Sequence, residues 1–272
     1  MDISSLYNKA ECVDTKEYSL SIRLMSGGFS FSIHNKLDDN SFRFFEKKSE
    51  TQNYLINDFE TDLLNNELIC DEYNSVNVIV ANDRFTLIPD EYFDLDSIEK
   101  YYYTNLEKRN EKILYQKLEN SGCYLIYGIN EDFYLFLKRT FTNIDFTHHL
   151  GLLTEYFITK SRLGNSDKMF CQIRNGMVDI ICYKKGKLVF LNTFHYKHKN
   201  DIIYFIMNVW STVEFNQIKD TLQIASDGDI VSSVSEMLKD YIAQITPVVF
   251  PSNAFNLGKE CLKAPFDIIA RL

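Results

Sequence analysis

The segment LQIASDGD (residues 222–229) has residue types and spacing that could bind an anion. A predicted strand here leads into a helix, and Asp227 and Asp229 stand at the start of that helix. The free N–H groups of a helix end can hold a phosphate. Two carboxylates at the same place would repel it, so capping of the helix by Asp227 and Asp229 is the favoured interpretation.

Histidine, serine and cysteine give weaker candidates. His195 and His198 (HYKH) would share a metal only on a helical turn, because residues three apart on a strand face opposite sides, and a solvated loop is favoured. Ser30, Ser32 and His34 share a strand face, as a nucleophile and its base would, but strand alternation produces the same row. The favoured interpretation of that row is a solvated face. No two of the six cysteines are spaced as CxxC, which argues against a zinc ribbon or a thioredoxin motif.

A predicted β-hairpin lies near the start of the chain, in SIRLMSGGFSFSI (residues 21–33). If Gly27 and Gly28 form a two-residue turn, Leu24 pairs with Phe31, and most apolar side chains fall on one face. The opposite face is then either wet or lines a cleft, and it carries Ser21, Arg23, Met25, Ser30, Ser32 and His34.

A second predicted hairpin repeats this layout in the other half of the chain. Asn175-Gly176 is the strongest two-residue hairpin signal, because both positions must tolerate a positive φ. The turn places Gln172 opposite Asp179. A third strand and then a helix follow each hairpin, at residues 41–45 and 50–64 in the first half and 187–194 and 201–215 in the second. The chain therefore appears as the same construction used twice.

The remaining pattern predicts the elements between and after the hairpins. Strands are expected at 76–81 and 222–225, an edge strand at 245–250 because of Pro247, a hairpin at 113–117 and 123–128, and helices at 95–106, 131–141, 149–162 and 229–241. The turn-rich residues 164–166 mark a boundary. We expect a first subdomain over residues 15–163, including an inserted hairpin–helix segment, and a second over 166–272.

Composition excludes several classes of function. The chain has 272 residues, 45% of them hydrophobic, which is enough for two cores. A net charge of −9 argues against a nucleic-acid partner. The first residues lack a signal peptide, and no apolar stretch is long enough to span a bilayer, so a cytoplasmic protein is expected.

The order of elements resembles the actin-like ATPase superfamily, whose fold is a duplicated ribonuclease H-like unit. More narrowly, it resembles an uncharacterised bacterial family of unknown function with that fold. The resemblance runs from about Tyr18 to the C-terminus and lies in element order. It implies an α/β fold with two related subdomains, each a mixed sheet flanked by helices, around a cleft. In the superfamily, the first tight turn of each repeat holds nucleotide phosphates.

Residues at the phosphate turns depart from the superfamily. An Asp usually ends the first strand of each repeat and holds magnesium or orients water, but Arg23 and Gln172 stand at those places. Asp179 is the only acid on the second hairpin, and the third nucleotide motif has a single glycine, Gly228. Without carboxylates for a hard cation, metal-assisted phosphoryl transfer loses its centre.

These departures predict a catalytically degenerate actin-like ATPase that acts as a binding or protein-interaction module. It could still hold ATP or ADP with magnesium, and no catalytic or metal-binding residue is assigned. The alternative is an active magnesium-dependent ATPase or kinase that uses Asp179 and Asp227, and a nuclease on the related fold is a weaker alternative. The residues expected near the cleft are Arg23, Ser26, Gly27, Gly28, Arg174, Asn175, Gly176, Asp179, Ser226, Asp227 and Gly228.

Overall fold

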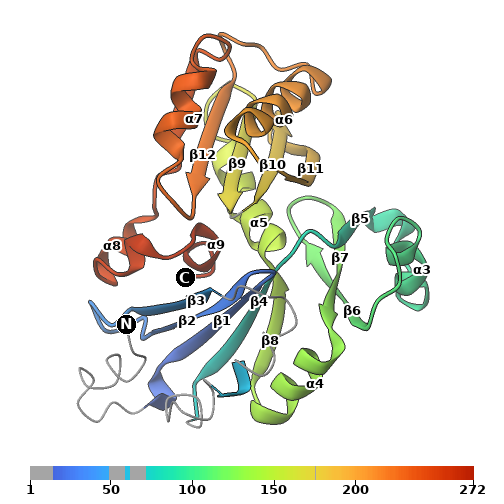
Figure 1. Cartoon of the computed structure of the whole chain (residues 1–272), viewed down its shortest axis with the longest axis vertical. Coiled ribbons are helices and arrows are strands. Elements are labelled where there is room, and N and C mark those ends of the chain that lie inside the picture. The colour runs from blue at the N-terminus through green and yellow to red at the C-terminus, as the bar shows by residue number, and fades with distance from the viewer. Residues whose placement is uncertain (1–14, 49–58, 62–71, 175) are drawn as a thin grey trace.

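Two five-stranded sheets, one in each half of the chain, form the frame of the molecule (Figure 1). The computed structural model describes residues 15–48, 59–61, 72–174 and 176–272. The first sheet has the order β3-β2-β1-β4-β8, built from β1 (Ser19–Met25), β2 (Gly28–His34), β3 (Arg43–Lys48), β4 (Ser75–Ala81) and β8 (Ile144–His148). The second has the order β11-β10-β9-β12-β13, built from β9 (Lys168–Arg174), β10 (Met177–Lys184), β11 (Lys187–His195), β12 (Thr221–Ser226) and β13 (Gln244–Pro247).

The two sheets have the same topology. In each, the first strand pairs antiparallel with the second and parallel with the strand that follows the crossover, as β1 does with β2 and β4 and β9 does with β10 and β12. The duplicated plan of two mixed sheets that the sequence predicts is confirmed. β13 lies at the edge of the second sheet, as Pro247 requires.

The registers of the two hairpins differ in how well the sequence predicts them. Gln172 lies opposite Asp179, as predicted. In the first hairpin the prediction is wrong by two residues, because Leu24 pairs with Phe29 and the turn consists of Ser26 and Gly27. Gly28, with a φ of 149°, already pairs with Met25 as the first residue of β2. A shift of two residues leaves each side chain on its predicted face, because the side-chain period of a strand is two.

Helices cover the sheets and join the two halves. α5 (His149–Ser161) connects the first sheet to the second and is buried over most of its length. α6 (Lys199–Thr212) and α7 (Val231–Leu238) cover one face of the second sheet, where Trp210 and Leu238 join the core residue Ile180. α4 (Glu131–Thr140) packs Phe133 and Leu137 into the core of the first half.

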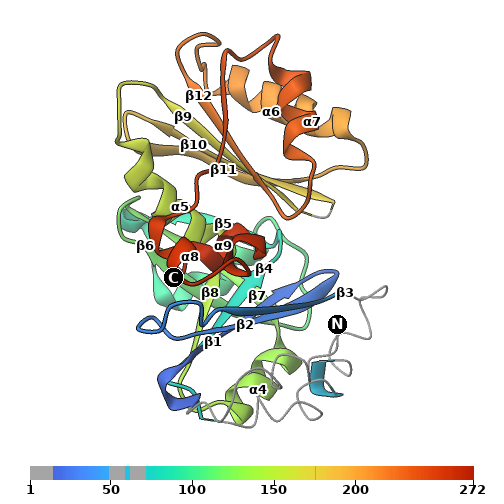
Figure 2. The same cartoon turned by 90° about the vertical axis from the view of Figure 1, so that its left-hand side faces the viewer.

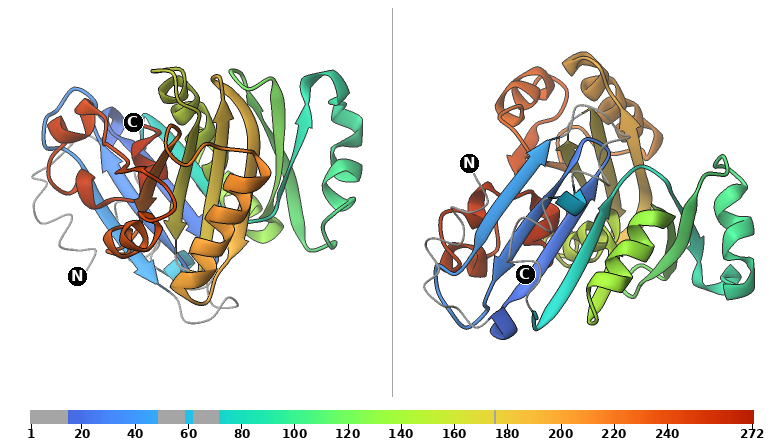
Figure 3. Two further views of the ribbon diagram at one scale, coloured as in Figure 1. Left: turned by 90° about the horizontal axis from the view of Figure 1, so that it is seen from above. Right: turned by 60° about the horizontal axis from the view of Figure 1, so that its bottom comes forward.

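A third, smaller sheet is inserted in the first half and projects to one side (teal and green in Figure 3). It consists of β5 (Phe85–Pro89), β6 (Glu111–Leu118) and β7 (Cys123–Asn130), with α3 (Ile98–Tyr103) against one face. The predicted hairpin is present as β6 and β7. The predicted helix over 95–106 is shorter than expected, because residues 95–97 form a 3-10 turn before α3.

The C-terminal segment, residues 252–272, follows the second sheet in sequence but packs against the first (Figure 2). Its helices α8 (Ser252–Asn256) and α9 (Phe266–Ile269) enclose a small core with Phe42 and Ile79. The segment covers the polar face of the first sheet. The predicted solvated face there is wrong, because the side chains below the segment are at most 3% exposed: Ser21, Ser30, Ser32 and His34.

The predicted helix over residues 50–64 lies outside the described residues, apart from residues 59–61. In the part of the chain that the structure describes, no helix is both long and apolar enough to cross a membrane.

Candidate functional site

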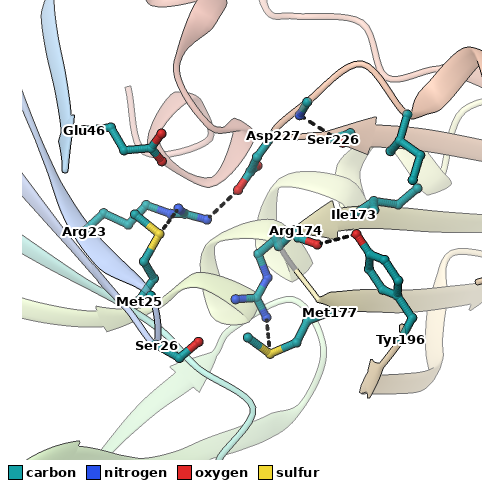
Figure 4. Close-up of a pocket in the computed structure, with 13 residues that line it drawn as sticks. Arg23, Met25, Ser26, Glu46, Ile173, Arg174, Met177, Tyr196, Ser226 and Asp227 are labelled. Atoms are coloured by element: carbon teal, nitrogen blue, oxygen red, sulfur yellow. Dashed lines mark hydrogen bonds and ion pairs between the residues drawn. The ribbon is translucent and has the colours of Figure 1, made fainter. Parts of the chain in front are cut away.

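A cavity of about 320 Å³ lies between the two halves, where the turn after β1 faces the turn after β9 and the end of β12 (Figure 4). The predicted site residues that line it are Arg23, Ser26, Gly27, Arg174, Ser226, Asp227 and Gly228. Of the described residues in the prediction, Gly28, Gly176 and Asp179 do not line it, and Asn175 lies outside the described residues. Met25 also lines it, in agreement with one of the two alternatives for its strand face, and sequence reasoning missed the remaining lining residues, which are Glu46, Ile173, Met177, Tyr196 and Ile230.

Arg23 lies fully buried at the end of β1 and is held by two carboxylates from the far end of the chain. Its Nε donates to Asp267 Oδ2 at 2.8 Å, and its Nη2 donates to Asp227 Oδ2 at 3.1 Å. Burial lowers the pKa of Arg23, but Asp267 and Asp227 more than offset this and raise it. Arg23 is therefore a permanent cation near the end of β1.

Asp227 points into the cavity and away from the helix that follows it. Its Oδ1 accepts a hydrogen bond from Gln172 Nε2 at 2.6 Å, and its side chain is 19% exposed. Among the described residues, α7 has no side-chain cap, so the predicted capping role of Asp227 and Asp229 is wrong. Burial raises the pKa of Asp227 to about 6, because Arg23 only partly offsets burial and Asp267 adds repulsion.

The second turn contains a tightly closed ion pair. Arg174 donates from Nε to Asp179 Oδ2 at 2.7 Å and from Nη2 to Asp179 Oδ1 at 2.9 Å. Asp179 also accepts from Thr193 Oγ1 at 2.7 Å. Burial raises the pKa of Asp179, but Arg174 and His149 lower it by a larger amount. The net effect is a lowered pKa, so the carboxylate stays ionised. Both oxygens of Asp179 are already occupied by protein donors.

His149 joins the two halves beside this ion pair. Its Nε2 lies 3.2 Å from Asp179 Oδ2, and its Nδ1 lies 3.3 Å from the carbonyl oxygen of Val80 on β4. Burial lowers the pKa of His149 and of the neighbouring His148. His148 caps α5, because its side chain accepts a hydrogen bond from Leu150 N at the start of the helix. No local pattern could have revealed the contact of His149 with Asp179, because the two residues are 30 apart in sequence.

The backbone at the turns is open toward the cavity. A Cβ added at Gly27 or at Gly228 would meet nothing within 4 Å. Gly176 has a φ of 72°, which only glycine adopts freely. Glu46 and Asp227 face the cavity on either side of Arg23 (Figure 4). A small ligand could therefore contact turn backbone from both halves.

The donor set does not fit a magnesium site. Magnesium needs carboxylate oxygens that are free to coordinate it. The carboxylates of Asp179, Asp227 and Asp267 already accept hydrogen bonds from arginine side chains. In the described part of the chain, no group of three or more His, Cys, Asp or Glu side chains could hold a metal ion.

Fold and cleft together define a protein with the actin-like ATPase fold. A crystal structure from Bacteroides thetaiotaomicron VPI-5482, described as a protein with actin-like ATPase fold and unknown function, superposes with a TM-score of 0.81. It is 32% identical, and the match covers 95% of this chain and 99% of that one. The PilM-PilN type IV pilus biogenesis complex matches with a TM-score of 0.54 and 9% identity, over 96% of this chain and 99% of that one, which shows the fold alone.

The chain belongs to the family described as "Protein of unknown function (DUF3822)", whose model matches residues 8–245. A search of curated proteins found no match.

Proposed function

We propose that this chain is a non-hydrolysing actin-like protein, a binding module whose cleft holds a small anion such as the phosphates of ADP or ATP. The single observation that carries the proposal is Arg23, a fully buried cation at the end of β1 where an active enzyme would need a carboxylate. A guanidinium at this position offers a divalent metal ion no ligand, and its N–H groups are donors that suit a phosphate.

The second turn supports the same conclusion. Gln172, at the corresponding end of β9, carries no charge, and it donates to Asp227. Asp179 is fully buried and bonded to Arg174. Freeing its oxygens for a metal would leave a guanidinium buried without its partner, which costs several kcal/mol. A metal-assisted transfer of the terminal phosphoryl group therefore has no ready set of ligands.

The cavity suits a ligand of modest size. Its volume of about 320 Å³ is at the low end of ligand sites, which span roughly 300–1,000 Å³. The open backbone beside Gly27 and Gly228 gives phosphate oxygens room to approach from both halves. We further propose a protein partner, because the fold neighbour PilM was solved in complex with PilN.

Hydrolysis and binding are tested separately. A phosphate-release assay with ATP and magnesium should show no turnover above buffer, and thermal-shift titration with ADP in EDTA should raise the melting temperature. Magnesium-dependent release that disappears in Asp179→Asn would contradict the proposal. The melting temperature and circular dichroism spectrum of Asp179→Asn show whether such a loss of activity comes from misfolding.

One observation favours a second candidate, an active ATPase or kinase. Asp227 lines the cavity, and its pKa is raised to about 6. A carboxyl group with such a pKa can accept a proton from an attacking water or hydroxyl near neutral pH. This candidate requires phosphate release that rises through pH 6 and is lost in Asp227→Asn, with the melting temperature of the variant unchanged.

A further inference from the structure

A second cavity, of about 210 Å³, lies where the chain passes between the two halves (Figure 2), and it shares no lining residue with the cleft. The chain makes this passage twice. The first connection leads from the end of α5 to β9, and the second leads from β13 to α8. Residues of both connections line the cavity: Leu163 and Lys168 on the first, and Val248, Val249 and Phe250 on the second.

The wall of this second cavity is mostly apolar. Phe157 and Val248 are buried, whereas Leu163 and Val249 are 63% and 72% exposed. Exposed apolar side chains beside an apolar cavity keep hydrocarbon surface in contact with water, and a ligand with an apolar part would cover that surface. The cavity therefore suits a hydrocarbon group.

The charged part of the lining is basic. Lys160 and Lys168 line the cavity, and among the described residues no acidic side chain does. The cleft differs, because Glu46 and Asp227 accompany its two arginines. The protein as a whole has a net charge of −9, so a basic lining runs against its average charge. Electrostatic complementarity favours a negatively charged group on the ligand.

Lys168 is held in place for a contact with such a group. Its Nζ donates to the carbonyl oxygen of Lys160 at 3.0 Å and also to that of Leu163, both at the end of α5. An ammonium group has three N–H donors, so one donor remains. Burial lowers the pKa of Lys168, and no carboxylate of the described residues offsets this effect. A carboxylate of the ligand would supply the missing counter-ion.

Lys160 places a second positive charge beside the same cavity. Its Nζ lies 5.5 Å from the centre of the ring of Tyr156, which also lines the cavity. The side chain of Lys160 is exposed, so water screens its attraction for an anion. Lys168 therefore fixes the position of an anionic group, and Lys160 adds a weaker attraction.

We propose that this second cavity binds a small apolar carboxylate of the medium-chain fatty acid type, with the carboxylate on Lys168 and the hydrocarbon chain along Leu163 and Val249. The volume of about 210 Å³ is below the roughly 300 Å³ at which drug-sized sites begin, so the ligand is small. A ligand in this position contacts both connections between the halves. The inference is independent of anion binding in the cleft.

Ligand-observed NMR titrations with three probes test the chemistry of the ligand. Octanoate has both a chain and a charge, octanamide has the chain without the charge, and acetate has the charge without the chain. Octanoate should bind with a dissociation constant of about 1 mM or below, octanamide about tenfold more weakly, and acetate at least about a hundredfold more weakly. The proposal is overturned if octanoate shows no saturable binding, or if octanamide binds as tightly as octanoate.

Variants of exposed residues test the location, each with a matched control. Lys160→Gln should weaken octanoate binding about two- to fivefold. Lys108→Gln, which removes an exposed lysine at the same distance of 5.5 Å from a tyrosine ring, that of Tyr103, should not. Val249→Asp should weaken binding at least about tenfold, because it places a negative charge beside the bound carboxylate. Ile218→Asp, at a side chain that is 77% exposed, should bind octanoate as the wild type does.

Amide chemical shifts of the labelled protein complete the test of location. Octanoate should cause its largest shifts at Leu163, Lys168 and Val249. In Lys168→Gln, octanoate and octanamide should bind equally, and the variants of exposed residues still decide the question if this variant folds poorly. Equal octanoate affinity in the wild type, Lys160→Gln and Val249→Asp would overturn the proposal. Shifts confined to Ser226 and Gly228 would also overturn it, because they would place octanoate in the cleft. None of these outcomes changes the expectation for ADP.

Discussion

Arg23 and Arg174 both lie near the turn of the first strand of their repeat, although the counterpart of Arg23 is Gln172, and the two arginines are neutralised in different ways. Arg174 is paired with Asp179, five residues away in the same hairpin. Arg23 is paired with Asp227 and Asp267, which lie 204 and 244 residues further along the chain. The second turn is therefore closed by its own sequence. The charge of Arg23 is compensated only when distant parts of the chain have come together.

The largest loss of stability should come from breaking the ion pair between Arg174 and Asp179. Asp179→Asn leaves Arg174 buried without its carboxylate and disturbs the contacts with Thr193 and His149. We expect a loss of about 3–5 kcal/mol in the free energy of unfolding, measured in urea. A loss below about 1 kcal/mol would show that this pair does not hold the second turn.

Asp267→Asn should cost less than Asp179→Asn. Arg23 keeps Asp227 as a partner after this change. We expect a loss on the order of 1–3 kcal/mol in the same urea experiment. A loss equal to that of Asp179→Asn would mean that Arg23 depends on Asp267 as strongly as Arg174 depends on Asp179. The contrast between the two turns would then fail.

The pH dependence of stability should show how strongly three buried histidines, His34, His148 and His149, are desolvated. Burial, with Lys36, lowers the pKa of His34 to about 4, and burial lowers the pKa values of His148 and His149. The unfolded chain then binds more protons between pH 4 and 6.5, so stability present above pH 6.5 is lost as the pH falls. Asp227, with a raised pKa of about 6, opposes this trend over part of the range.

His34→Asn isolates the contribution of the polar face to this pH dependence. Without the His34 imidazole, the free energy of unfolding should decrease less between pH 6.5 and pH 4, by on the order of 1–3 kcal/mol. Chemical unfolding at three pH values measures the slope. An unchanged slope would indicate that His34 is in contact with water in the folded protein.

The smallest effect is expected at the surface contact between the halves. His195 Nε2 lies 2.7 Å from Asp83 Oδ2, but the two side chains are 68% and 37% exposed. His195→Ala should change the free energy of unfolding by less than about 1 kcal/mol. A larger loss would place the main link between the halves here, and not at the buried arginines.

Local patterns in the sequence were sufficient for the repeat and for the second hairpin. Asn175-Gly176 fixes a two-residue turn, so the pairing of Gln172 with Asp179 follows from it. In the first hairpin, Ser26, Gly27 and Gly28 allow more than one turn, and the predicted register is off by two. Alternation was still enough to place Arg23 on the correct face, because an even shift preserves the pleat.

Long-range packing decided what the sequence could not reveal. Asp267 reaches Arg23 only because the C-terminal segment returns to the first sheet. The same return buries Ser30 and Ser32, whose alternation with apolar residues indicated a solvated face. Asp227 precedes a helix and has the sequence of a cap, but the nearby guanidinium group of Arg23 is a stronger partner than the helix N–H groups.

The effect of magnesium on ADP affinity tests the central claim most directly. Isothermal calorimetry should give the same dissociation constant, within about threefold, in EDTA and in magnesium, because Arg23 and Gln172 offer a metal ion no ligand at the two turns. Tightening by tenfold or more on adding magnesium would contradict the account, because it would require carboxylates that coordinate the metal in the cleft.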